Sequence, residues 1–178
     1  MDAVTITILL LIAAGALVLL YLTGMLKRPE HVVICAALIA GAFVIRGLCM
    51  NHVTLDYENF LAGWVDYYRQ NGGFAALGDK IGNYNLPYLY FLAFFSYIGV
   101  YDLYLIKALS IVFDVVLAWG CMQLVGEFTK STAKKLTAFF LVLYWPTVIL
   151  NGAYWGQCDS IYAAFAVLSI YLALSGRG

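Results

Sequence analysis

Charged residues are scarce in this sequence. Asp, Glu, Lys and Arg make up only 11% of the chain, whereas 64% of the residues are hydrophobic and the mean hydropathy is +0.88. Soluble domains usually carry about 25% charged residues. The composition therefore excludes an ordinary soluble domain and is typical of a chain that crosses a membrane several times.

The sequence also lacks charge imbalance and cysteine pairs. Ten basic and ten acidic residues cancel, and no basic run with interleaved aromatic residues indicates a nucleic-acid partner. The four cysteines contain no CxxC pair, which indicates neither a disulfide framework nor a zinc site; they are Cys35, Cys49, Cys121 and Cys158.

Long apolar runs predict an all-α membrane protein. Residues 4–26 are too long and too evenly apolar for a signal-peptide core, so we expect a transmembrane helix. Lys27 and Arg28 follow it and should stay cytoplasmic, which places the amino terminus outside. With the later apolar runs, about five transmembrane helices are expected; they are residues 4–26, 32–50, 103–125, 136–150 and 160–174.

The first outer loop, residues 51–102, should contain juxtamembrane helices. Phe60, Trp64 and Tyr68 recur at i, i+4 and i+8, which predicts an interfacial helix over residues 58–71. Residues 87–100 are also apolar, but 14 residues reach about 21 Å as a helix, short of a hydrocarbon core of about 30 Å. A crossing there would also place later lysines outside. We therefore predict a juxtamembrane or re-entrant helix.

Two acidic loops lie on the same outer face in this topology. Asp56 and Glu58 open the first loop, and Asp56 is either a general base or a helix N-cap. The second loop, residues 151–159, brings Trp155 and Gln157 next to Asp159, which is either a second active-site carboxylate or the N-cap of the next helix. Cys158 in this loop is expected to react from outside.

Ionisable residues also occur within the apolar runs. Arg46 and Lys107 lie near outer helix ends, where each either snorkels to the headgroups or neutralises a phosphate. Asp114 lies two turns deeper than Lys107, where it is either functional or paired with a polar group of another helix. The tyrosines between Tyr57 and Tyr104 form either an aromatic belt or a sugar-stacking surface.

Several motifs in this order resemble the multi-pass glycosyltransferases of the GT-C superfamily, in particular bacterial mannosyltransferase-like members. The resemblance covers residues 36–174 and rests on LDYENF, GNYNLPYLY, IKALSIVFD and YWGQCDSIYAAF. It implies transfer of a hexose, mannose-like, from a polyprenyl-phosphate donor to a glycan, protein or lipid acceptor, usually with inversion. The setting it implies is the extracytoplasmic face of a bacterial plasma membrane.

The resemblance also implies roles for individual residues. Asp56 is the expected base, Glu58 the second acid of the motif and Asp159 a further carboxylate. Arg46 and Lys107 are expected to bind the lipid phosphate, with Trp155 and Gln157 at the substrate. No cofactor is required, although an acidic pair can hold a divalent cation.

Two departures from the superfamily pattern stand out. Residues 4–26 form a span before the usual first one, and the chain ends after the fifth, so we expect residues 1–178 to be a single transmembrane domain from the N-terminal portion of a longer enzyme. The alternatives are a transporter or flippase whose path is lined by Lys107 and Asp114, and an inactive accessory fragment.

Overall fold

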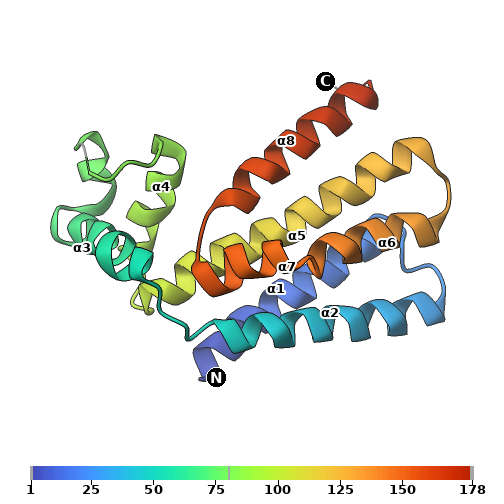
Figure 1. The fold of residues 1–178 in the computed structure, drawn as a ribbon, viewed down its shortest axis with the longest axis horizontal. Coiled ribbons are helices and arrows are strands. Elements are labelled where there is room, and N and C mark those ends of the chain that lie inside the picture. The colour runs from blue at the N-terminus through green and yellow to red at the C-terminus, as the bar shows by residue number, and fades with distance from the viewer. Residues whose placement is uncertain (1, 80, 177–178) are drawn as a thin grey trace.

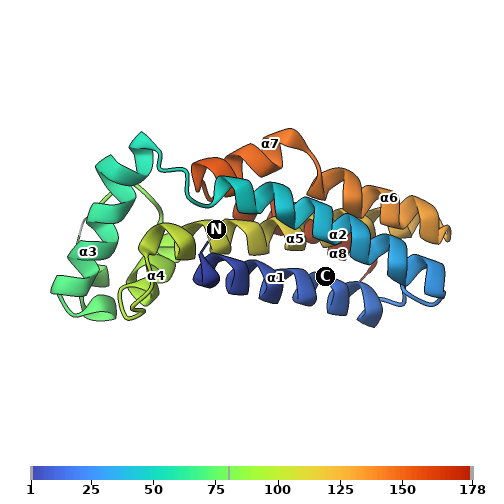
Figure 2. The same cartoon turned by 90° about the horizontal axis from the view of Figure 1, so that it is seen from below.

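The computed structural model describes residues 2–79 and 81–176, and within these residues it contains helices and no strand. Figures 1 and 2 show an elongated body of helices with a smaller helical unit at one end. The body is made of α1 (Ala3–Leu22), α2 (Pro29–Cys49), α5 (Asp102–Phe128), α6 (Thr132–Leu143), α7 (Pro146–Ile149), η3 (Leu150–Trp155) and α8 (Asp159–Leu174). The prediction of an all-α membrane protein is confirmed.

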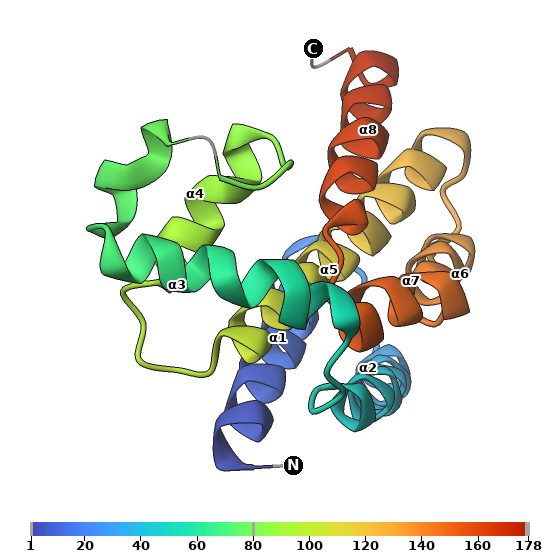
Figure 3. The same ribbon diagram turned by 60° about the vertical axis from the view of Figure 1, so that its left-hand side comes forward.

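Helix α5 is the centre of the body. It packs against α1, α6 and α8 and also contacts η3 and the smaller unit at its N-terminal end (Figure 3). In the part of the chain that the structure describes, α1, α2 and α5 are long and apolar enough to cross a bilayer, and α6 with α7–η3 makes a fourth candidate. Helix α8, predicted as the fifth span, has 16 residues and is about 24 Å long, which is shorter than the other three.

The span predicted over residues 136–150 is a bent helix rather than a straight one. Helix α6 ends at Leu143, and α7 begins at Pro146 after a bend of 46°. Proline has no N–H to donate to the preceding turn and its ring clashes with that turn, so the helix cannot continue straight through it. Beyond the bend, η3 and the loop that follows it lie at the end of the body next to the smaller unit (Figure 1).

The smaller unit is the predicted set of juxtamembrane helices. It contains η1 (Tyr57–Leu61), α3 (Ala62–Gln70), η2 (Gly73–Gly78) and α4 (Leu86–Phe95). The helix predicted over residues 58–71 is present as η1 and α3, and the one predicted over residues 87–100 is present as α4, which ends already at Phe95. The aromatic face predicted for this helix is only partly packed on protein. Tyr68 is fully buried in a core shared with Leu92 of α4 and Leu103 of α5, whereas Phe60 is 51% exposed.

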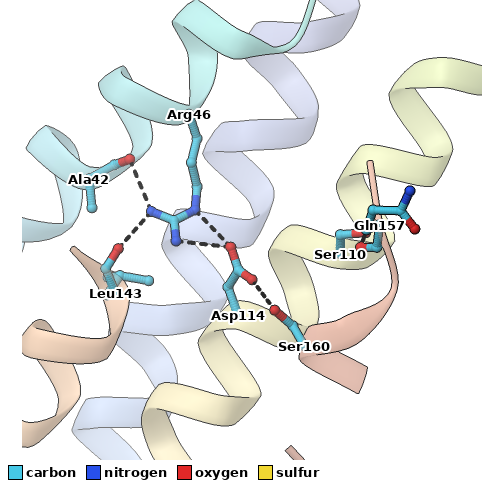
Figure 4. Close-up of polar contacts among 7 residues, drawn as sticks. All are labelled: Ala42, Arg46, Ser110, Asp114, Leu143, Gln157 and Ser160. Carbon is cyan, nitrogen blue, oxygen red and sulfur yellow. Dashed lines mark hydrogen bonds and ion pairs between the residues drawn. The ribbon is translucent and has the colours of Figure 1, made fainter. Parts of the chain in front are cut away.

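Arg46 and Asp114 form an ion pair inside the body (Figure 4). Arg46 Nε and Nη2 donate to Asp114 Oδ2 at 3.1 and 2.9 Å, and both side chains are 0% exposed. Asp114 Oδ1 accepts a hydrogen bond from Ser160 Oγ of α8 at 2.6 Å. The pair thus joins α2, α5 and α8, and of the two roles considered for Asp114, pairing with another helix is the one observed.

The same arginine also supports the bend. Arg46 Nη1 donates to the main-chain oxygen of Leu143, the last residue of α6, at 2.9 Å. A carbonyl at the end of a helix has lost its intrahelical partner, and leaving it unsatisfied in an apolar environment costs several kcal/mol. Arg46 therefore caps the broken helix from a neighbouring one. It does not reach the surface as predicted for a phosphate ligand.

We predict that Arg46→Ala strongly destabilises the fold. Removing one partner of a buried pair leaves an uncompensated charge, and losses of about 3–5 kcal/mol in unfolding free energy are typical. The matched control is Arg28→Ala, because Arg28 pairs with Glu30 at the surface and such pairs contribute at most about 1 kcal/mol. Unfolding in detergent measures both; equal stability of the two variants would contradict this role of the pair.

Candidate functional site

Asp56 lies where the first loop meets the second. Trp155 Nε1 and Gln157 Nε2 both donate to Asp56 Oδ2, at 3.0 and 2.5 Å, across 99 and 101 residues of sequence. The backbone of Asp56 is helical and its side chain makes no capping bond; Thr54 Oγ1 accepts from the amide of Tyr57 instead. The carboxylate is therefore held by the other loop and does not serve as an N-cap.

The two oxygens of Asp56 have different surroundings. Oδ2 accepts both hydrogen bonds, whereas Oδ1 has no hydrogen bond to any residue that the structure describes. Two cavities adjoin the side chain. One, of about 310 Å³, is lined by Asp56, Phe60, Leu61, Trp64, Asn83, Tyr84 and Gln157. The other, of about 490 Å³, is lined by His52, Val53, Thr54, Leu55, Asp56, Tyr154 and Trp155.

Gln157 is fixed at every polar group of its side chain. Its Nε2 donates to Asp56, and its Oε1 accepts from the hydroxyl of Tyr84 at 2.9 Å. Its main-chain oxygen accepts from Ser110 Oγ of α5 at 2.7 Å (Figure 4). A side chain held in this way presents its amide donor to Asp56 in one orientation, which preorganises the carboxylate.

Burial raises the pKa of Tyr84 to about 12, with the nearby Cys158 thiol and Asp56 carboxylate acting in the same direction. The hydroxyl therefore stays protonated at neutral pH and remains a donor to Gln157. Tyr84, Asn83, Trp64 and Phe60 had no predicted site role. The sequence signal for them is the dense aromatic first loop, which an aromatic belt largely explains and for which a sugar-stacking surface is the alternative.

Lys107 lies inside the protein and not at the cavities. It is 0% exposed, and its Nζ donates to the main-chain oxygens of Cys49 and His52 at 2.7 and 2.6 Å. Arg46 is also enclosed, in its pair with Asp114. No lysine or arginine is among the described residues that line either cavity. The geometry thus gives no support to the predicted binding of a lipid phosphate by these two cations.

The remaining predicted acids lie beside the site. Glu58 is exposed, its side chain has no hydrogen bond or ion pair with a described residue, and it lines neither cavity. Asp159 is the first residue of α8 and accepts from Asn151 Nδ2 at 2.8 Å, so it belongs to the first helical turn and is not the N-cap. Of the predicted site residues, the structure brings together Asp56, Trp155 and Gln157.

A π-helical turn occurs next to the site in each loop. η1 begins one residue after Asp56, and η3 ends at Trp155. π-helical turns are rare and are found frequently at functional sites. Gly156 follows η3 with a φ of +81°, a left-handed conformation that few other residues adopt.

Cys158, which follows Gln157, is only 2% exposed, so the expected accessible thiol is buried. Within residues 2–79 and 81–176, no three His, Cys, Asp or Glu side chains are grouped as they would be to hold a metal ion. Acid pairs such as Asp56 and Glu58 therefore lack a third ligand of these types among the described residues.

No protein-family model, curated protein or solved structure matches the chain. Fold and site together define an all-α membrane protein with a carboxylate between two cavities at one end of its helices. The resemblance to GT-C glycosyltransferases rests on the sequence motifs alone.

We predict that Tyr84 titrates with a pKa of about 12, against an ordinary value of 10.0. A raised folded-state pKa means that the stability from the neutral hydroxyl is complete below pH 10 and is lost as the pH rises through about 12. The difference in tyrosinate absorbance between the parent protein and Tyr84→Phe isolates this one group. A difference curve centred near pH 10 would contradict the burial and the bond to Gln157.

Proposed function

We propose that this protein is an integral-membrane glycosyltransferase that transfers a hexose from a polyprenyl-phosphate donor to an acceptor hydroxyl. The observation that carries the proposal is the geometry of Asp56. One oxygen is held by Trp155 and Gln157, the other has no hydrogen bond to a described residue, and Asp56 lines a cavity with aromatic walls. A general base needs an oriented carboxylate with one oxygen available to the proton that it removes.

The reaction follows from this arrangement. Asp56 Oδ1 takes the proton of the acceptor hydroxyl while the hydroxyl oxygen forms a bond to the anomeric carbon. The bond between that carbon and the phosphate oxygen breaks, and the lipid phosphate leaves with the electron pair. Attack from the side opposite the phosphate inverts the anomeric configuration. A positioned base of this kind contributes about 10²–10⁴-fold to the rate.

The cavity next to Asp56 has the chemistry of a carbohydrate site. Phe60, Trp64 and Tyr84 offer aromatic surfaces, and Asn83 and Gln157 offer amide groups for hydroxyls. Its volume of about 310 Å³ lies at the lower end of the range of ligand pockets. This combination favours a small, neutral, polyhydroxylated ligand.

Charge along the body favours an extracytoplasmic site. Lys27 and Arg28 lie between α1 and α2, Lys130 lies between α5 and α6, and Lys134 and Lys135 lie in the first turn of α6. These segments are at the end of the body opposite the smaller unit, whose η1 directly follows Asp56 (Figure 1). Basic residues next to spans are retained in the cytoplasm. The proposal therefore places Asp56 at the extracytoplasmic surface, in a bacterial plasma membrane as the resemblance implies.

We favour transfer over transport because the residues that would line a transport path are enclosed. Lys107 and Asp114 are both 0% exposed, and each is hydrogen-bonded to protein groups. Charged groups that line a path face a water-filled cavity.

The test of the reaction is Asp56→Asn. The variant keeps the shape of the side chain but cannot accept the proton, so transfer of radiolabelled hexose from polyprenyl-phosphate-hexose should fall at least about 100-fold in membranes that contain the chain. Asp66→Asn, an exposed acid of α3 outside the cavities, is the matched control. Equal transfer by the parent and Asp56→Asn would refute the assignment of the base.

The test of the orientation uses single cysteines introduced into a cysteine-free chain. Glu58→Cys in η1 and Lys130→Cys between α5 and α6 both replace exposed residues. The two segments lie at opposite ends of the molecule (Figure 1). A membrane-impermeant thiol reagent should label Glu58→Cys in intact cells and Lys130→Cys only after the cells are opened. The reverse pattern would place Asp56 in the cytoplasm.

A further inference from the structure

Helix α5 carries a line of polar residues inside the protein. Lys107, Ser110 and Asp114 are spaced at i, i+3 and i+7, so their side chains share one face of the helix. They are 0%, 1% and 0% exposed in a helix whose other buried residues are mostly apolar. We call these three residues the α5 stripe.

Each member of the α5 stripe holds a segment that leads to the Asp56 site. Lys107 binds the main-chain oxygens of Cys49 and His52, at the start of the loop that carries Asp56. Ser110 binds the main-chain oxygen of Gln157. Asp114 accepts from Ser160, three residues after Gln157, as Figure 4 shows.

The second loop lies directly on the α5 stripe at Gly152. A Cβ atom built on Gly152 would be 3.2 Å from both carboxylate oxygens of Asp114 and 3.4 Å from Cβ of Ser110. Distances of this size are tighter than ordinary packing, and the carboxylate is fixed by Arg46 and Ser160. Even one methyl group at this position would therefore push the loop away from α5.

We propose that the α5 stripe is the positioning unit of the Asp56 site. It fixes the first loop through Lys107 and the second loop through Ser110 and Asp114, and it thereby sets the contact of Asp56 with Trp155 and Gln157. The stripe touches none of the reacting groups and acts through the loops. The effect on catalysis rests on the proposed glycosyl transfer, whereas the effect on loop position does not.

The energetics favour positioning over a contribution to stability. Buried charges carry a desolvation penalty, and well-packed apolar residues in place of a buried pair are often equally or more stable. Lys107 and Ser110 direct their bonds to loop carbonyls, and Ser110 contacts the same residue whose amide binds Asp56. The bonds of Lys107 and Ser110 therefore determine the geometry of the Asp56 site.

The decisive variant is Gly152→Ala, with Gly63→Ala as the matched control because a Cβ on Gly63 meets nothing within 4 Å. The reporter is Cys158, kept as the only cysteine after Cys35, Cys49 and Cys121 are replaced by alanine. Cys158 follows Gln157, is 2% exposed, and has a pKa raised by burial, so its thiol should react slowly in the parent chain.

Gly152→Ala should accelerate labelling of Cys158 by a small thiol reagent at least about tenfold, because the loop opens more often. Gly63→Ala should label at the parent rate. In the transfer assay, Gly152→Ala should lower kcat of the folded protein, because the loop that moves carries Trp155 and Gln157, which hold Asp56. A purely structural role would lower the unfolding temperature and leave kcat of the folded protein unchanged.

A second pair of variants keeps the proposal testable if Gly152→Ala fails to fold. Ser110→Ala removes the bond to Gln157, whereas Ser96→Ala removes a buried serine bonded only to the main chain of its own helix. Ser110→Ala should accelerate labelling of Cys158, and Ser96→Ala should not. Parent-rate labelling in both Gly152→Ala and Ser110→Ala would overturn the proposal. Because labelling needs no substrate, that result is separate from normal transfer by Asp56→Asn, which would refute only the glycosyl transfer.

Discussion

The buried ion pair between Arg46 and Asp114 is the interaction on which the rest of the structure depends. Two full charges inside an apolar helical body are tolerated only when the polar groups around them are satisfied. Here the Arg46 guanidinium donates to Asp114 and to the main-chain oxygen of Leu143, and the Asp114 carboxylate also accepts from Ser160. Three helices and the end of a fourth are thereby fixed against one another. A bundle held by apolar contacts alone has little to set the register of its helices in lipid, because lipid tails are as apolar as the side chains.

The bent helix links the Arg46–Asp114 pair to the Asp56 site. Pro146 breaks the helix after Leu143, and Arg46 satisfies the carbonyl that the break exposes. The chain beyond the bend forms η3, which lies on α5 and ends in the loop that contributes Trp155 and Gln157 to Asp56. A straight helix of the same length would direct its end along the body and not across it. The break, the buried charges and the contact between the two loops are therefore parts of one arrangement.

The sequence predicted features that depend on local pattern or on charge position. Apolar run length located α1, α2 and α5, and the length argument against a span over residues 87–100 agrees with α4, which has only 10 residues. The prediction that Asp56 lies on the same face as Trp155 and Gln157 agrees with their hydrogen bonds. The sequence could not predict the partner of each buried charge. Whether Arg46, Lys107 or Asp114 snorkels or pairs depends on the rotation of α2 and α5 about their axes. The roles of Tyr84 and Gly152 could not be predicted either, because each is defined by a contact with a residue more than 35 positions away in the sequence.

Electrostatics also constrain how a lipid-phosphate donor could meet this site. Asp56 is the only carboxylate that lines either cavity within the described residues, and no lysine or arginine lines them. A phosphate charge about 5 Å from the carboxylate would be repelled by about 3 kcal/mol at an effective dielectric constant of about 20. The repulsion falls as the phosphate moves to the far side of the sugar, with the anomeric carbon between the two anions. That is the alignment of an inverting displacement. Under the proposed function, the Asp56 carboxylate therefore accepts the proton, and its negative charge also favours one orientation of the donor.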